Sequence, residues 1–214
     1  VENEGNGRMC TTVPPIHIAV TGIEKVVEKL SDIPPLLDIL TKSATGQEIT
    51  TYFNMISSPR QEGEKDGPKS MHLVLLDNGR SKIHQNNDMQ ETLKCIRCGS
   101  CINHCPVYTQ LGGHAYGTVY PGPIGITLEP QKQGITELGE LTSLCTMCGA
   151  CGEVFPVQIP LPKLINKLRS EAVEGNNTNE LIEGARSKRK PLESLSWQVW
   201  KQVYSSPFIY SIFS

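Results

Sequence analysis

Short apolar runs and turn residues alternate through the first part of the chain and predict an α/β pattern. The run at residues 16–20 is bounded by Pro and Gly, which predicts a short buried strand. Apolar positions over 23–30 have helical spacing, and a second helix whose leucines and isoleucines face inward is expected from residue 31 to 40. Residues 49–56 and 71–76 predict two further strands, with a polar loop between them. Three short strands would make a thin sheet, so we expect this domain to lack its N-terminal part.

The middle of the chain, residues 85–175, carries helical signals and no strand signals. Helices are expected just before residue 93, over 136–144 and over 161–173, and the Gly- and Pro-rich stretch at 112–125 predicts an irregular loop. Residues 176–214 begin as a polar linker, pass through the basic run 186–190 and end in aromatic residues with helical spacing. We expect these aromatic residues to pack in a core or against another subunit rather than on a membrane surface. They are Trp197, Trp200, Tyr204, Phe208, Tyr210 and Phe213.

The pattern therefore predicts an α+β chain in three parts. Residues 1–84 form the C-terminal portion of an α/β domain, residues 85–175 form an all-α domain, and residues 176–214 form the linker and helical tail. The formal net charge of −2 gives no electrostatic reason to expect nucleic acid as a partner. The sequence contains no apolar run long enough to span a membrane, and its acidic first residues do not resemble a signal peptide.

The number and spacing of the cysteines point to a metal-binding protein. The chain has eight cysteines, and seven of them stand two or three residues apart in two tight groups. Disulfide scaffolds are short secreted chains, so metal ligation in a reducing compartment is the better interpretation. The eighth, Cys10, has no ligand-spaced neighbour, and we expect it to be a small buried residue.

Residues 95–106 match C-x2-C-x2-C-x3-C-P, the cluster-binding run of bacterial ferredoxins. Thiolates at this spacing let one loop surround three irons of a cube, while its backbone amides offset the negative charge of the cluster. Gly99 allows the backbone to approach closely without a side-chain clash. In this motif the fourth cysteine ligates the other cluster, so a second run is required. The four cysteines are Cys95, Cys98, Cys101 and Cys105.

The second run, residues 145–156, repeats the first but ends in Phe-Pro instead of Cys-Pro. By the crossing rule it holds a [4Fe-4S] cluster together with Cys105. Its own three ligands are Cys145, Cys148 and Cys151. The other cluster, of [4Fe-4S] or [3Fe-4S] type, is then held by the first three cysteines of the first run. Its fourth ligand is expected at position 155, where Phe155 cannot bind iron.

Three interpretations of Phe155 remain open. The first cluster is a three-iron species that needs only three thiolates, or it is a cube with one iron bound by water or by a substitute such as His104 or Glu153. In the third interpretation Phe155 stands in place of a cysteine through a single-base codon change. We favour the third, because the flanking Gly152 and Pro156 retain the frame of a cysteine run.

A pair of structural zinc sites is the main alternative for the cysteines. Zinc sites favour separated C-x2-C pairs or mixtures of Cys and His, whereas here four cysteines fall within eleven residues and are nearly repeated. The stretch between Cys105 and Cys145 is longer than a compact hairpin ferredoxin needs. This length favours a helical ferredoxin domain with two clusters. In that stretch His114 and Tyr116 could tune a cluster or touch a partner, but shielding the clusters from water is the simpler role.

Several segments resemble the lactate utilisation protein B family, the iron–sulfur subunit of the bacterial lactate-utilisation complex. The resemblance is carried by residues 4–10, 17–25, 113–117 and 120–123 and by both cysteine runs. It implies an α/β domain with an isomerase-like fold followed by a helical dicluster ferredoxin domain. It also implies an electron-transfer subunit for the oxidation of L-lactate to pyruvate, with a cysteine-rich subunit and a second α/β subunit as partners. The family pattern has Cys where this chain has Phe155.

We therefore predict a cytoplasmic electron relay that passes electrons to a quinone or another carrier, with a peripheral position on the inner face of the membrane as a variant. No general base or nucleophile constellation stands out, so no catalytic residue is assigned and the substrate chemistry is expected elsewhere in the complex. A redox- or iron-sensing regulator is the alternative function, and a zinc-stapled interaction module is less favoured.

Overall fold

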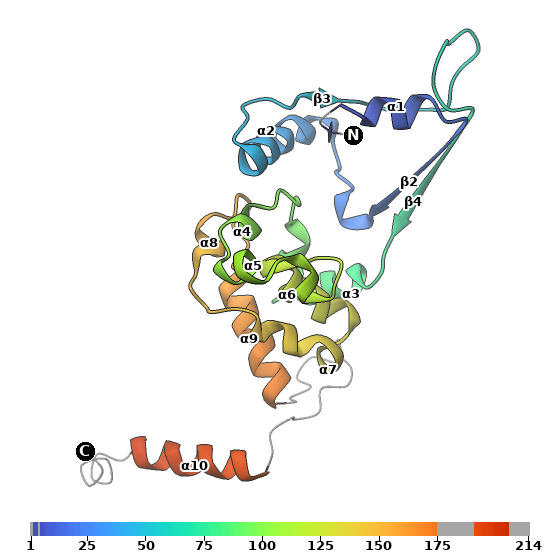
Figure 1. Ribbon diagram of the computed structural model, residues 1–214. Helices are drawn as coiled ribbons and strands as arrows, with labels where there is room; N and C mark the ends of the chain where they lie inside the picture. The colour runs from blue at the N-terminus through green and yellow to red at the C-terminus, as the bar shows by residue number, and fades with distance from the viewer. Residues whose placement is uncertain (1, 4, 175–190, 206–214) are drawn as a thin grey trace.

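The computed structural model describes residues 2–3, 5–174 and 191–205. Figure 1 shows an open N-terminal part next to a body of short helices, and α10 (Pro191–Ser205) follows along the chain. The elements of the N-terminal part are β1 (Glu2–Asn3), α1 (Gly7–Thr12), β2 (Ile16–Gly22), η1 (Ile23–Lys25), η2 (Leu30–Asp32), α2 (Ile33–Thr45), β3 (Tyr52–Phe53) and β4 (Ser70–Leu76). The chain thus mixes helix and strand, in agreement with the expected α+β class.

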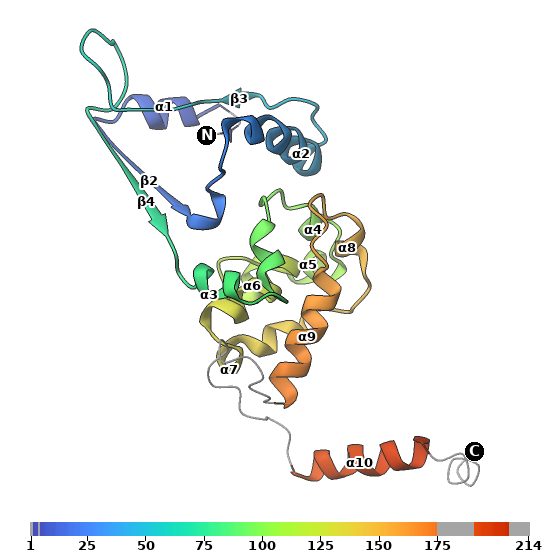
Figure 2. The ribbon, with the colours of Figure 1, turned by 180° about the vertical axis from the view of Figure 1, so that it is seen from behind.

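Two predicted strands are present, and they pair with each other. β2 and β4 lie parallel, with Ile16 opposite Ser70 and Gly22 opposite Leu76, so the chain between them crosses over through α2. The prediction that β2 is buried was wrong. Ile18 and Val20 are 60% and 63% exposed, and no apolar residue of the described positions 5–82 is part of the buried core. Figure 2 shows the β2–β4 ribbon from behind, standing away from the helical body.

The other predictions for the N-terminal part agree with the structure only in part. The helix expected over 23–30 was wrong, because only the single 3₁₀ turn η1 forms before the backbone becomes extended at Val26. β-branched side chains at 26 and 27 favour that extended path, and Val26, Val27 and Leu30 are 63%, 40% and 72% exposed, so tertiary packing does not stabilise a helix here. The strand expected over 49–56 shrinks to β3. The second helix forms as α2, with prolines in its first turn and Gly46 ending it in a left-handed conformation.

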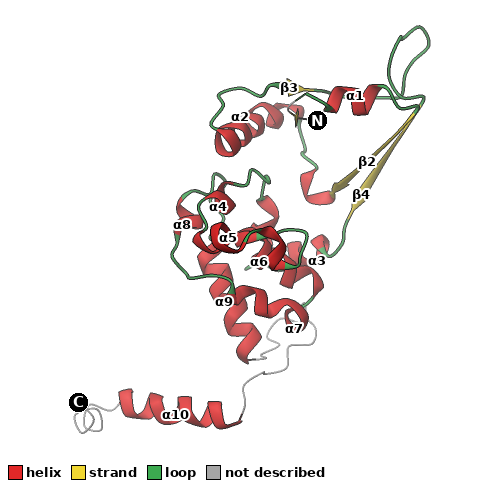
Figure 3. Ribbon diagram, in the orientation of Figure 1, coloured by secondary structure: helices red, strands yellow, loops and turns green. Residues whose placement is uncertain are grey.

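The helical body contains no strand in the part that the structure describes, as Figure 3 shows. Its core lies where α9 packs against α6 and η5, and the buried apolar side chains of α9 are Leu161, Leu164, Ile165 and Leu168. Its elements are α3 (Arg80–Gln85), η3 (Gln90–Lys94), α4 (Ser100–Asn103), α5 (Pro106–Leu111), η4 (Gly113–Tyr116), α6 (Gly122–Gln133), α7 (Ile135–Leu138), η5 (Gly139–Ser143), α8 (Ala150–Glu153) and α9 (Leu161–Glu174).

Two predictions for the body need correction. The helix expected over 136–144 is divided into α7 and η5. The irregular loop expected over 112–125 ends early, because α6 begins at Gly122 with Pro123 in its first turn, a position where the missing N–H of proline costs nothing. α6 is almost wholly buried and carries Glu129, which is fully enclosed.

The predicted aromatic helix forms as α10. Trp197 meets Trp200 edge to face with ring centroids 5.7 Å apart, Trp200 stacks on Tyr204 at 4.5 Å, and each of the three is about half exposed. They therefore do not pack in a core within the part that the structure describes. Phe208, Tyr210, Phe213, the polar linker and the basic run 186–190 lie outside the described residues. No helix among the described residues is long and apolar enough to cross a membrane.

Candidate metal centre

The two cysteine loops have the same backbone conformation. Arg97 and Met147, each one residue before the second cysteine of its run, both have positive φ, at 64° and 58°. Gly99 and Gly149, just after that cysteine, have φ of 80° and 85°, which a side chain would strain although a Cβ there would meet only open space. Each loop then enters a short helix, α4 or α8, that carries its third cysteine. The repeated sequence thus produces two concave loops of similar shape, the first cradle at residues 95–101 and the second cradle at residues 145–151.

The first cradle surrounds a cavity of about 210 Å³. Cys95, Cys98 and Cys101 line it, and Phe155 closes it from the other loop with a side chain that is 5% exposed. The substitute ligands considered above, His104 and Glu153, do not line this cavity. The ring of His104 lies 2.9 Å from the carbonyl oxygen of Ser100. Position 155 is therefore where the first cavity meets the second loop.

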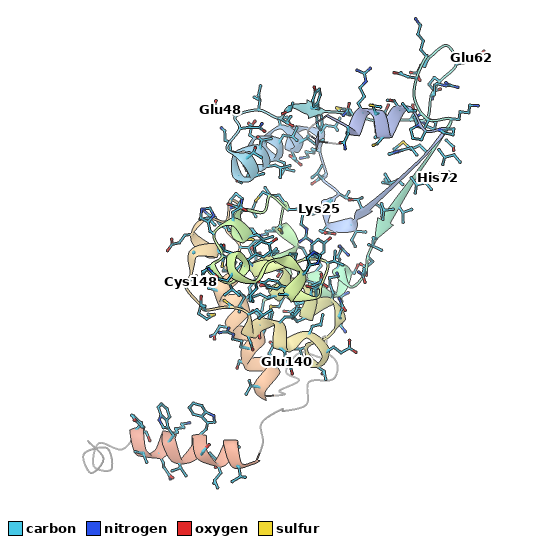
Figure 4. The ribbon with its side chains drawn as sticks, viewed as in Figure 1. Lys25, Glu48, Glu62, His72, Glu140 and Cys148 are labelled. Atoms are coloured by element: carbon cyan, nitrogen blue, oxygen red, sulfur yellow. The ribbon has the colours of Figure 1, made fainter. Side chains whose placement is uncertain are left out.

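The second cradle has four thiols around it. Its own loop contributes Cys145, Cys148 and Cys151, and Cys105 crosses from the first loop to the same cavity. Backbone amides point at two of these sulfurs, from Met147 to Cys145 at 3.3 Å and from Tyr108 to Cys105 at 3.5 Å. The two loops are tied together by the hydroxyl of Ser100, which donates to the carbonyl of Val154 at 3.3 Å. Cys148 is exposed and lies at the outer edge of the body (Figure 4).

Burial governs the ionisation of the inner thiols. It raises the pKa of Cys101 to about 12 and that of Cys151 to about 11, and neighbouring thiols add to both shifts. Thiols in such surroundings form thiolates only when a positive charge lies next to them, and iron supplies that charge. Burial, together with Cys105 and Cys145, also raises the pKa of Tyr116 to about 12. The hydroxyl of Tyr116 is buried and has no hydrogen-bond partner among the described residues.

A buried charge cluster joins the N-terminal part to the first loop. The carboxylate of Glu24, 6% exposed, lies 2.5 Å from Arg80 Nε, 3.7 Å from Arg97 Nη2 and 4.0 Å from Lys25 Nζ. Lys25 also donates a hydrogen bond to the backbone carbonyl of Cys95, and Figure 4 shows it where the N-terminal part approaches the helical body. Burial, and next the charge of Arg97, lower the pKa of Lys25. Cations therefore crowd this side of the first cavity.

Arg97 is held from a second direction. Its guanidinium carbon lies 3.9 Å from the centroid of the Tyr120 ring, and both side chains line the first cavity. Lys132 lies 5.3 Å from the same ring and is paired with the buried Glu129 at 3.3 Å. The Nη1 nitrogen of Arg97 is buried without a hydrogen-bond partner among the described residues. Sequence reasoning missed this group, although the arginine inside the first C-x2-C was a visible signal.

Two remaining expectations have a clear outcome. Cys10 is exposed, so the prediction of a small buried residue was wrong. Tyr116 is buried near Cys105 and Cys145, whereas His114 is exposed, and neither side chain lines one of the two cavities.

The residues present fit thiolate-bound clusters. Two cavities each meet three thiols of one loop, and both rest on glycine turns. Backbone amides point at two sulfurs of the second cavity, and the first is lined by Arg97, whose Nη1 is buried without a partner among the described residues. Among the described residues no three His, Cys, Asp or Glu side chains lie close enough together to bind a single metal ion.

Three family models match successive parts of the chain. A LUD domain matches residues 1–76, a 4Fe-4S dicluster domain matches 91–159, and the C-terminal region of lactate utilisation protein B matches 167–214. No solved structure matches the chain.

The chain is also similar to curated proteins. The chain is 44% identical to lactate utilization protein B of Bacillus velezensis and 43% identical to that of Bacillus subtilis, in each case over 94% of this chain and 42% of the relative. It is 45% identical to an uncharacterized electron transport protein, YkgF, of Escherichia coli, over 81% of this chain and 36% of the relative. The chain therefore spans less than half the length of the relatives it matches. The dicluster match and these relatives support an iron–sulfur electron-transfer role.

Proposed function

Because this chain resembles lactate utilization protein B over 94% of its length, we propose that it is the iron–sulfur electron-transfer subunit of a complex that oxidises L-lactate to pyruvate. The observation that carries this proposal is the pair of neighbouring cavities, each walled by thiols of its own loop, with Cys105 crossing from one loop to the other cavity. In the proposal, the first cavity holds one cluster and the second holds a [4Fe-4S] cluster.

The ligand assignment follows the walls of the cavities. Cys95, Cys98 and Cys101 hold the first cluster, for which Phe155 offers no ligand. The second cluster is held by Cys105, Cys145, Cys148 and Cys151. When bound, such clusters exchange single electrons at potentials set by burial, net charge and hydrogen bonds to sulfur. The chain's own residues supply those three influences and keep the two sites adjacent, since α4 and α8 pack together and share the Ser100 hydrogen bond.

The walls of the cavities suit relay better than substrate chemistry. The described residues around them are thiols, apolar groups, Thr146, Tyr120 and Arg97, with no carboxylate or imidazole to remove a proton from a hydroxy acid. Oxidation of lactate releases two electrons and two protons, so a separate site must bind the substrate and take the protons. We assign that site to the rest of the complex, with a cysteine-rich subunit and a second α/β subunit as partners.

The proposal includes the fate of the electrons. Paired one-electron centres can accept the two electrons in turn and pass them to a quinone or another carrier. We place the complex in the cytoplasm, at the inner face of the membrane when a quinone is the acceptor. Cys148, exposed at the edge of the second cavity, gives a redox partner access to that site.

Electron passage tests the proposal. Anaerobically purified protein is reduced with dithionite, freed of reductant and mixed with a soluble quinone or a redox dye, and the bleaching of the iron–sulfur absorbance is followed as it reverses. Stoichiometric transfer to the acceptor is expected, Cys148→Ser should impair it, and Cys10→Ser, which alters an exposed cysteine outside both cavities, should not. Intact clusters that transfer no electron to any acceptor would contradict the relay and favour the sensing alternative.

A further inference from the structure

The two cavities differ in the charge around them. Three cations, Lys25, Arg80 and Arg97, gather around the single carboxylate of Glu24 beside the first cavity. Lys132, near the Tyr120 ring, forms an ion pair with Glu129, and this pair carries no net charge. The first cavity is thus bordered by a surplus of positive charge.

The second cavity has a different neighbour. Beside its loop lies Arg169 of α9, whose guanidinium donates to the carbonyl oxygens of Thr142 at 2.7 Å and Cys145 at 2.5 Å. This side chain is turned to backbone carbonyls and does not line the cavity. Cys148 is also exposed there, so water reaches this cradle and screens charges around it.

Arg97 is fixed rather than free at the first cavity. It stacks on Tyr120 at 3.9 Å and is paired with Glu24 at 3.7 Å, and its Nη1 nitrogen is buried with no hydrogen-bond partner among the described residues. Arg97 is 25% exposed, and a cation held in place with most of its side chain covered stabilises added negative charge more than a fully exposed cation does. An electron added to a group in this cavity is such a charge.

We propose that Arg97, held by Tyr120 and by Glu24 of the N-terminal part, makes the first site the higher-potential site of the two. This inference rests on the proposed function, since it takes both cavities to hold clusters. One electron then moves from the reduced second cluster to the oxidised first cluster, and no proton is transferred and no bond is broken. Electrons therefore collect at the end of the body that faces the N-terminal part.

The sign of the charge gives the test. On anaerobically purified protein, a redox titration followed by electron paramagnetic resonance measures the midpoint potential of each site, with Cys148→Ser identifying the signal of the second. Arg97→Gln should lower the potential of the first site, whereas Glu24→Gln, which removes a negative charge while Tyr120 still holds the guanidinium, should raise it. The second site should shift much less in both variants.

Lys94→Gln is the matched control. It removes one positive charge directly next to Cys95, but this side chain is 59% exposed and paired with Glu91, so water screens it and little shift is expected. Arg97→Lys keeps the charge and should remain closer to the parent protein than Arg97→Gln.

Several results would overturn the inference. A first site of lower potential than the second, an Arg97→Gln variant with an unshifted first site, or shifts of the same sign in Arg97→Gln and Glu24→Gln would each do so. If the Arg97→Gln variant does not retain its cluster, the midpoint potential of the first site in Glu24→Gln still tests the inference, because it should rise. A parent protein without any iron–sulfur signal would refute the proposed function instead, so the two failures are distinguishable.

Discussion

Replacing Phe155 by cysteine tests the ligand arrangement at its weakest point. Phe155 is 5% exposed, lies in the core cluster and closes the first cavity opposite three thiols. Without iron, Phe155→Cys removes most of a buried ring, and a large-to-small change of this kind costs about 3 kcal/mol of unfolding free energy. With iron, the new thiol stands where a fourth ligand is missing, so the variant should bind one more iron per chain.

Phe155→Cys should therefore lower the stability of the iron-free protein but increase the iron that the protein binds, and the two measurements can be compared directly. Denaturant unfolding of chelator-treated protein should show a less stable variant, while anaerobically purified variant should lose any oxidised-state signal of three-iron type and gain the reduced-state signal of a cube. Val157→Cys is the control, because Val157 packs against the same core but does not line the cavity. Iron content and spectrum equal to those of the parent protein would refute the assignment of position 155 to the first site.

Three further predictions follow from the geometry of the loops. Cys105→Ser should abolish or alter the resonance signal of the second site and leave that of the first, although Cys105 belongs to the first run; loss of the first signal alone would contradict the crossing. Tyr116→Phe removes a buried hydroxyl without a protein partner, so iron-free stability should stay equal or rise by about 1 kcal/mol in denaturant unfolding, while the second site loses a donor and its midpoint potential falls. Gly149→Ala strains a backbone at φ 85°, so it should lower the free energy of unfolding by about 1 to 2 kcal/mol and speed the loss of the cluster. Gly46→Ala, at φ 75° at the end of α2, should lower the free energy of unfolding as much but retain the cluster.

Local sequence patterns were sufficient for part of the fold. β2 and β4 could be predicted because β-branched and apolar runs between Pro, Gly and Asn-Gly turns have few other solutions. The helix expected over 23–30 failed because spacing shows which face is apolar but not whether a surface exists to receive it. α6 was hidden because its Gly and Pro residues are typical of loops, and only tertiary burial makes that stretch helical.

The sequence likewise predicted some features of the candidate site and not others. The register of the two runs placed Phe155 opposite the first three cysteines, and the structure brings that side chain to the first cavity. The ion pair of Arg97 with Glu24 could not be read from spacing, since it joins residues of distant segments through the approach of η1 to the first loop. Cys10 was misjudged because the burial tendency of free cysteine is an average that this exposed turn of α1 does not follow.

The most direct test of the central claim is a count of iron and acid-labile sulfide in protein purified without oxygen. Two thiolate-bound clusters predict brown material with iron and sulfide in near-equal amounts, and with enough of both for two clusters per chain. Colourless protein that contains zinc and no sulfide would contradict the account.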